Sequence, residues 1–89
     1  MFFLCNPHNP LGIVWSREDL TRMCEICIRH QVLIVSDEIH SDLIFHGKKH
    51  IPTATLSEEI AAHVITCTSG TKTFNLAGIQ AAAIVFPNQ

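Results

Sequence analysis

The run Val32-Leu33-Ile34-Val35 is the feature that most restricts how this chain can fold. Consecutive aliphatic residues, most of them β-branched, are typical of a strand in a parallel sheet that is covered on both faces. Parallel strands need a crossover between them, and that crossover is usually a helix. The run therefore predicts an α/β fold.

Other segments supply the remaining parts of such a sheet. Three more apolar runs predict strands: Phe2–Cys5, Val64–Cys67 and Ala81–Phe86. A helix is predicted from about Arg17 to His30, because Ser16 and Asp19 form a capping-box pattern ahead of a periodic apolar stripe. The order of these elements indicates part of an open α/β sheet.

Shorter elements are predicted in the connections. Gln31 ends the first helix without a glycine, so it is expected to adopt the left-handed conformation. Leu43-Ile44-Phe45 predicts a short extended segment before a turn at Gly47. Ser57 is predicted to cap a short helix that runs through Ala62.

Composition and charge exclude several classes of protein. The chain has 89 residues, of which 47% are hydrophobic and 16% charged, so we expect it to be a fragment whose apolar surface is covered by more protein. Its formal net charge is −2, and no basic cluster is longer than Lys48-Lys49, which argues against nucleic acid or an anionic membrane as a partner. No apolar run approaches the ~18 residues of a membrane span, and no signal-peptide pattern is present.

The four cysteines are expected to be small core residues in a reducing compartment, which favours a cytoplasmic location. The pattern Cys24-x-x-Cys27-x-x-His30 resembles half of a zinc site. A second pair of ligands is missing, and Leu20 and Ile28 share the same helix. Zinc is therefore the minor interpretation.

Polar side chains follow the predicted strands at their carboxyl ends. Asn9, Asp37, Ser69 and Lys72 each come within a few residues of an apolar run. Ligands of open α/β sheets bind outside the carboxyl ends of parallel strands, so these groups are expected to meet at one edge. Taken singly, each residue also has an ordinary structural interpretation. Asn9 can be a turn residue, Asp37 a loop carboxylate, Ser69 a helix cap and Lys72 a solvated lysine.

Two other chemistries fit this edge less well. Val32–His40 resembles a Walker B strand and Gly70-Thr71-Lys72-Thr73 the end of a P-loop, but the glycine-rich loop is missing and the order is reversed. Asp37, His40 and Asp42 are ligand types that suit iron or manganese. A continued strand would not place all three on one face, so a metal site is again the minor interpretation.

Pyridoxal 5′-phosphate (PLP) fits the residue types better. Its aldehyde needs a lysine, its ring nitrogen a carboxylate, and its phosphate hydroxyl and amide donors. Lys72, Asp37 and Ser69 are groups of these types. Lys72 is the candidate nucleophile and base.

A family resemblance makes this interpretation specific. Asn9-Pro10-Leu11-Gly12, Asp37-Glu38-Ile39-His40 and Ser69–Asn75 resemble, in order and spacing, the class I/II PLP-dependent aminotransferase superfamily of fold type I. Cys5–Pro10, Ser36–Asp42 and His50-Ile51-Pro52 look most like its cystathionine β-lyase, or cysteine-S-conjugate C–S lyase, branch. The resemblance implies an α/β, three-layer, mostly parallel sheet with an antiparallel last strand. Residues 1–89 would then be a partial PLP-binding large domain, truncated at both ends.

The resemblance also implies roles for single residues. Lys72 would hold the PLP aldehyde covalently and later remove the substrate Cα proton. Asp37 would pair with the protonated ring nitrogen, Asn9 with the ring 3-oxygen and Ser69 with a phosphate oxygen. His40 stands where many aminotransferases have a tyrosine, so it would lie near the ring oxygen or act as an indirect hydrogen-bonding partner.

One departure from the family pattern concerns the phosphate. Gln80 stands where a phosphate-pairing arginine or lysine is common in the wider family. This departure and His40 both look like the lyase branch and favour it.

Three functions follow from these observations. The first is a PLP-dependent C–S β-lyase that acts on an amino-acid substrate such as cystathionine, as a homodimer when full length. The second is a class I/II aminotransferase with the same site. The third is a non-catalytic fragment or small binding module, because the family's phosphate loop, ring-stacking aromatic and substrate-carboxylate arginine are not recognisable in this sequence.

Overall fold

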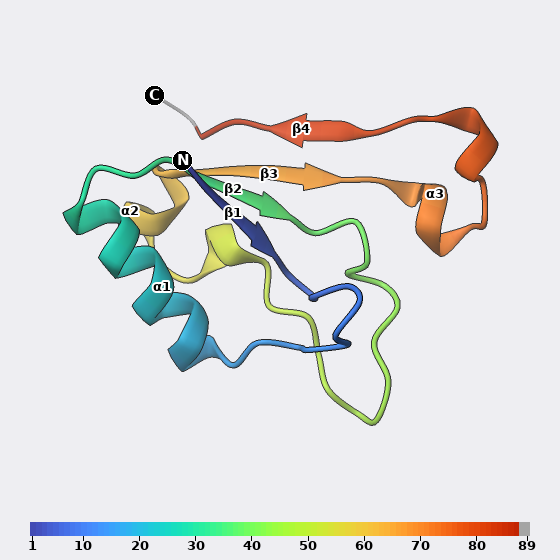
Figure 1. Cartoon of the computed structure of the whole chain (residues 1–89), viewed down its shortest axis with the longest axis horizontal. Helices are drawn as coiled ribbons and strands as arrows, with labels where there is room; N and C mark the ends of the chain where they lie inside the picture. The colour runs from blue at the N-terminus through green and yellow to red at the C-terminus, as the bar shows by residue number, and fades with distance from the viewer. Residues whose placement is uncertain (88–89) are drawn as a thin grey trace.

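A four-stranded sheet with the order β1-β2-β3-β4 forms the frame of the molecule (Figure 1). In this computed structural model, which describes residues 1–87, the strands are β1 (Phe2–Cys5), β2 (Ile34–Asp37), β3 (Val64–Thr68) and β4 (Ala83–Val85). β1, β2 and β3 run parallel, whereas β4 pairs antiparallel with β3. The predicted α/β class, with a mostly parallel sheet and an antiparallel last strand, is confirmed.

Helix α1 (Arg17–Arg29) is the crossover between β1 and β2. The Ser16 hydroxyl accepts a hydrogen bond from the Asp19 amide at 3.0 Å, as predicted. The Asp19 carboxylate does not reach the backbone but accepts from the Ser16 hydroxyl at 2.6 Å. At the other end Gln31 has a φ of 54°, so the expected left-handed residue is confirmed.

Four shorter helical segments complete the fold: η1 (Thr53–Thr55), α2 (Glu58–Ala61), α3 (Gly70–Thr73) and η2 (Ala77–Ile79). Helix α2 is capped by Ser57, whose hydroxyl accepts from the Ile60 amide at 3.1 Å. Helix α3 replaces the loop that the sequence predicted for Ser69–Asn75. It forms because the Ser69 hydroxyl accepts from the Thr71 amide and so caps a helical turn.

The helices α1 and α2 lie on the same side of the sheet (Figure 1). The hydrophobic core lies between these helices and the sheet. Its buried members come from the two helices and the first three strands: Leu4, Leu20, Cys24, Cys27, Ile34, Ile60 and Val64. Each large aliphatic side chain buried here stabilises the fold by about 1.5–3 kcal/mol. This side of the sheet is called the covered face below.

The opposite side, called the open face below, carries no helix from residues 1–87. Phe3 is 73% exposed, and Val35 and Asp37 of β2 remain partly exposed. Successive side chains of a strand point to opposite sides, so β2 divides its residues between the two faces. The prediction that Val32–Val35 is covered on both faces is wrong for this part of the chain.

Strand boundaries differ from the sequence prediction in β2, β3 and β4; β3 ends one residue later than predicted, at Thr68. β2 begins at Ile34, because the Val32 amide is still bound to the Cys27 carbonyl of the preceding helix. β4 is shorter than Ala81–Phe86, because it pairs only opposite Thr66–Thr68 of β3. The extended segment expected at Leu43–Phe45 is not a strand, although the turn at Gly47 is present, with a φ of 71°.

The cysteines are free thiols, as expected, and Cys24 and Cys27 lie in the core. Burial, with the neighbouring Cys27 and Glu25, raises the pKa of Cys24 to about 11, so its thiol stays protonated. His30, the third residue of the zinc pattern, is exposed, and residues 1–87 contain no group of three metal-ligating side chains. No helix of this part of the chain is long and apolar enough to cross a membrane.

Candidate active site

The carboxyl ends of β1, β2 and β3 point to the same edge of the sheet, as the arrowheads in Figure 1 show. Backbone hydrogen bonds continue the pairing just past these ends. The Asn6 amide donates to the Asp37 carbonyl at 2.9 Å, and the Glu38 amide donates to the Cys67 carbonyl at 2.8 Å. The backbone around Asp37 is therefore held from both neighbouring strands.

Asp37 is the last residue of β2, not a residue of the following loop as the sequence indicated. Its partners in the sheet are Cys5 and Cys67, and its side chain is partly exposed. Oδ1 accepts the Ile39 amide at 3.2 Å, which fixes the carboxylate against its own chain. Other positions of this carboxylate remain able to accept a ligand's hydrogen bond.

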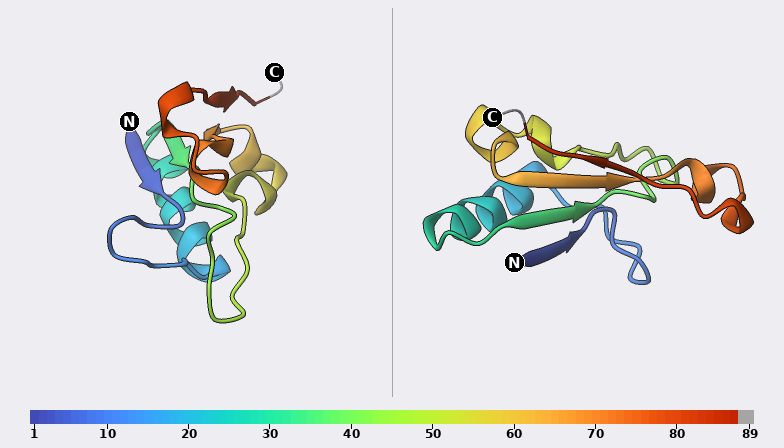
Figure 2. Two further views of the ribbon diagram at one scale, coloured as in Figure 1. Left: turned by 90° about the vertical axis from the view of Figure 1, so that its right-hand side faces the viewer. Right: turned by 90° about the horizontal axis from the view of Figure 1, so that it is seen from above.

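Ser69 and Lys72 lie just beyond β3, at the start and within α3. This part of the chain projects past the strand ends, away from α1 and α2 (Figure 2). The Ser69 hydroxyl donates to the Ala81 carbonyl at 2.6 Å and also lies 2.7 Å from the Thr71 hydroxyl. Its single proton is thus already used, and a ligand at Ser69 would have to displace the Ala81 contact.

Lys72 has an exposed side chain in the last turn of α3, and its amine makes no hydrogen bond or ion pair within residues 1–87. These residues alone do not desolvate the amine. The amine is, however, accessible for reaction with a carbonyl compound. Thr73 links the same helix to the segment after β2 through its hydroxyl, which donates to Asp42 at 2.9 Å.

Asn9 and His40 line one pocket with a volume of about 470 Å³. The pocket lies between the segment after β1 and the segment after β2. The two segments also supply its other walls: Pro7, His8, Pro10, Gly12, Val14, Leu43, Ile44, Phe45, His46 and Lys48. Asp37, Ser69 and Lys72 do not line it, so the pocket unites two of the five predicted site residues.

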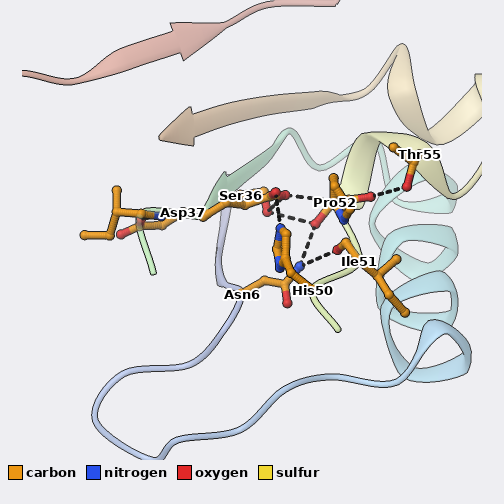
Figure 3. A network of polar contacts seen from close by, with 10 residues as sticks. Asn6, Ser36, Asp37, His50, Ile51, Pro52 and Thr55 are labelled. Carbon is orange, nitrogen blue, oxygen red and sulfur yellow. Dashed lines mark hydrogen bonds and ion pairs between the residues drawn. The ribbon is translucent and has the colours of Figure 1, made fainter. Parts of the chain in front are cut away.

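A buried polar network beneath this edge was missed by the sequence analysis (Figure 3). Glu38 is at its centre, with a side chain that is only 5% exposed. Oε1 accepts the Ser36 hydroxyl and the Thr53 amide, each at 2.9 Å, and Oε2 lies 2.7 Å from Nε2 of His50. The network joins the end of β2 to the segment from His50 to Thr53.

Hydrogen bonds extend this network to the end of β1. The Asn6 amide group donates to the Ile51 carbonyl at 3.0 Å and to the Thr53 hydroxyl at 3.3 Å. The Thr53 and Ser36 hydroxyls are 2.9 Å apart. The Ser36 hydroxyl donates its proton to Glu38, so the Thr53 hydroxyl must be the donor to Ser36. The hydrogen bonds therefore form a chain in which Asn6 donates to Thr53, Thr53 to Ser36 and Ser36 to the Glu38 carboxylate.

The network decides the charge of Glu38. Burial alone would raise the pKa of this carboxyl, but the hydrogen bonds from His50, from Thr53 and from Ser36 outweigh burial and hold its pKa below the ordinary value of 4.5. Glu38 is therefore an ionised carboxylate on the covered face. In the sequence, the position of Glu38 directly after Asp37 was the signal that its side chain lies on the face opposite to that of Asp37, because successive side chains of a strand point to opposite faces.

The whole of residues 1–89 matches the family model for aminotransferase class I and II. The chain belongs to this family. Cystathionine beta-lyase PatB of Bacillus subtilis is 55% identical over 89 residues, which is all of this chain and 23% of that protein.

Solved structures of the family agree with the fold described above. A PLP-bound protein from Clostridium difficile 630, named as an aminotransferase, has a TM-score of 0.94 and 52% identity over 98% of this chain and 22% of its own. The PLP-bound C–S lyase from Staphylococcus hominis has a TM-score of 0.89 and 39% identity, again over 98% of this chain and 22% of its own. The chain thus spans less than a quarter of the proteins that it matches.

Proposed function

We propose that the full-length protein is a PLP-dependent C–S β-lyase that cleaves the Cβ–S bond of cystathionine or a related cysteine conjugate. The observation that carries this proposal is the 55% identity to cystathionine beta-lyase PatB, which extends over all 89 residues. The net reaction consumes one water and yields a thiol, pyruvate and ammonia. Residues 1–89 would contribute part of the large domain of that enzyme.

The side chains at the strand ends fit PLP as a cofactor. Asp37 presents a partly exposed carboxylate on the open face, where it can accept a hydrogen bond from the protonated ring nitrogen. The exposed Lys72 amine is accessible to the aldehyde. Asn9, with His40 in the same pocket, offers hydrogen bonds to the ring oxygen, and Ser69 can reach the phosphate once its hydroxyl leaves Ala81.

When bound, PLP supplies an electron sink for the negative charge that develops at the substrate Cα. Asp37 contributes a carboxylate beside the ring nitrogen, which favours the protonated form of that nitrogen. Lys72 contributes the base that takes the Cα proton. Departure of the thiolate from Cβ then distinguishes a lyase from an aminotransferase.

The alternative is an aminotransferase with the same residues in the same roles. The Clostridium difficile protein named as an aminotransferase favours it, with 52% identity. The two functions differ in whether a group leaves Cβ or the proton is returned to the cofactor. The third possibility is that these 89 residues are a non-catalytic fragment or binding module when isolated.

The experiment that separates the first two functions uses the full-length protein, PLP and L-cystathionine without any keto acid. The proposal predicts equal amounts of thiol and pyruvate, measured with a thiol reagent and with lactate dehydrogenase. Turnover that depends strictly on an added keto-acid acceptor would contradict the lyase and support the aminotransferase. Size-exclusion chromatography with light scattering tests the homodimer that we propose for the full-length protein.

A further inference from the structure

We propose that Glu38 is a positioning residue for Asp37 and that His50 and Thr53 hold Glu38 in place. This inference rests on the proposed function, because Glu38 acts only through Asp37. The Glu38 side chain lies on the covered face. Its hydrogen-bond partners are Ser36, Thr53 and His50, none of which is a predicted site residue. Its effect is to fix which carboxylate of the Asp37-Glu38 pair faces the cofactor.

Side chains alternate between the two faces along β2 and the residue that follows it. Ser36 and Glu38 are buried on the covered face, whereas Asp37 between them is partly exposed on the open face. A shift of one residue would exchange the two carboxylates. The buried site can accept Glu38 because three donors meet its oxygens, whereas the open face supplies none of them.

Moving Glu38 out of its buried site would break several hydrogen bonds at once. An ionised carboxylate that leaves its partners would leave the Thr53 amide buried without an acceptor, and the Ser36 hydroxyl would lose its bond to Glu38. His50 would lose the contact of Nε2, and its Nδ1 is already buried without a hydrogen-bond partner within residues 1–87. The network thus resists any rotation of the backbone at Glu38.

Glu38 and Asp37 share one stretch of backbone that is hydrogen-bonded to both neighbouring strands. The Glu38 amide is bound to Cys67, and the Asp37 carbonyl is bound to the Asn6 amide. Asn6 is itself held by the Ile51 carbonyl and by Thr53. Backbone bonds within the sheet therefore hold Asp37 from both neighbouring strands, and the side-chain bonds on the covered face hold the adjacent residue. Figure 3 shows the side-chain part of this arrangement around Asn6, Ser36 and His50.

The test compares three variants of the full-length protein: Glu38→Ala, Glu38→Gln and the control Thr55→Ala. Glu38→Ala removes both carboxylate oxygens, which accept from Ser36, Thr53 and His50. Glu38→Gln keeps the oxygen for Ser36 and Thr53 and can donate to neutral His50. Thr55→Ala removes a hydrogen bond of the same segment, 2.7 Å to the Pro52 carbonyl, without contact to Glu38.

The first readout is amide hydrogen exchange in the cofactor-free protein. Glu38→Ala is expected to speed exchange at residues 37–39 by about tenfold or more relative to amides in the middle of α1. Glu38→Gln should restore most of the protection, and Thr55→Ala should leave it unchanged. Equal acceleration in β2 and α1 would overturn the proposal, because it would show a loss of global stability only.

The second readout is the binding and visible spectrum of PLP. Glu38→Ala is expected to weaken PLP binding by about tenfold or more and to shift the visible band in the same direction as Asp37→Asn, whereas Glu38→Gln should stay within about threefold of the wild type. Wild-type affinity and spectrum in Glu38→Ala would overturn the proposal. If the wild-type protein itself does not bind PLP, the proposed function fails, and the exchange experiment still decides whether Glu38 holds Asp37.

Discussion

The two faces of β2 differ in how their polar side chains are satisfied. On the covered face Glu38 is 5% exposed and has partners for both oxygens, and Ser36 is fully buried beside it. On the open face Asp37 is partly exposed and has one local backbone partner. Two adjacent carboxylates thus have opposite functions: the satisfied one stabilises the fold, and the unsatisfied one remains available for a ligand.

The same contrast separates the beginning and end of the chain. The core residues come from the segment between Leu4 and Val64. After β3, the segment that carries Lys72 is held to the rest of the molecule by the pairing of β4 with β3 and by the hydrogen bond from Thr73 to Asp42. Every residue of β4 is exposed. We infer that the catalytic lysine of the proposed enzyme lies on the less tightly packed part.

The largest effect is expected for Lys72, in the less tightly packed part of the chain. Lys72→Ala in the full-length protein should lower the lyase rate by about 10²-fold to 10⁴-fold or more, because one group supplies both the cofactor attachment and the base. Its exposed side chain makes no contact that the fold needs, so the melting temperature of the cofactor-free protein should not change. A pyruvate assay measures the lyase rate, and a thermal scan measures the melting temperature. Lys49→Ala, which removes another exposed lysine, is the control, and comparable losses in both variants would contradict the assignment.

The next effect concerns the core on the covered face. Ile34→Ala should lower the free energy of unfolding of the full-length protein by about 2–5 kcal/mol, because a fully buried aliphatic side chain is lost. Leu33→Ala deletes as many carbon atoms from the neighbouring residue, which is 43% exposed, and should cost much less. Urea unfolding of both variants measures the difference. Equal losses would show that the two faces are packed alike.

A smaller, pH-dependent effect is expected at Glu38. The folded pKa of this carboxyl is below its ordinary value of 4.5, so its contribution to stability is fully present above pH 4.5 and is lost as the pH falls through the folded pKa. Glu38→Gln should therefore be less stable than the wild type at neutral pH, and the difference should shrink below pH 4.5. Urea unfolding across this range measures it. A difference that stays constant with pH would refute the charged state of Glu38.

Much of the fold was predictable, because it depends on local patterns. The apolar runs gave the number and order of the strands, and Ser16 and Ser57 marked two helix starts correctly. The boundaries of β2 were wrong because Val32 still completes the turn of the preceding helix, an interaction that hydrophobicity does not reveal. The helix α3 was predicted as a loop, although its cap Ser69 was visible.

The site was predictable only in part. Asn9, Asp37, His40, Ser69 and Lys72 were proposed from their positions after strands and from family motifs, and their roles remain predictions. The buried network was missed because it depends on His50 and Thr53, which lie 12 and 15 residues from Glu38 along the chain. No sequence periodicity links residues across an irregular loop.

We propose above that Lys72 holds the cofactor at the edge of the sheet where β1, β2 and β3 end. The most direct test is to load the full-length protein with PLP, reduce it with borohydride, digest it and find the labelled lysine by mass spectrometry. The account predicts the label on Lys72. A label on Lys48 or Lys49, or no label on any lysine, would contradict it.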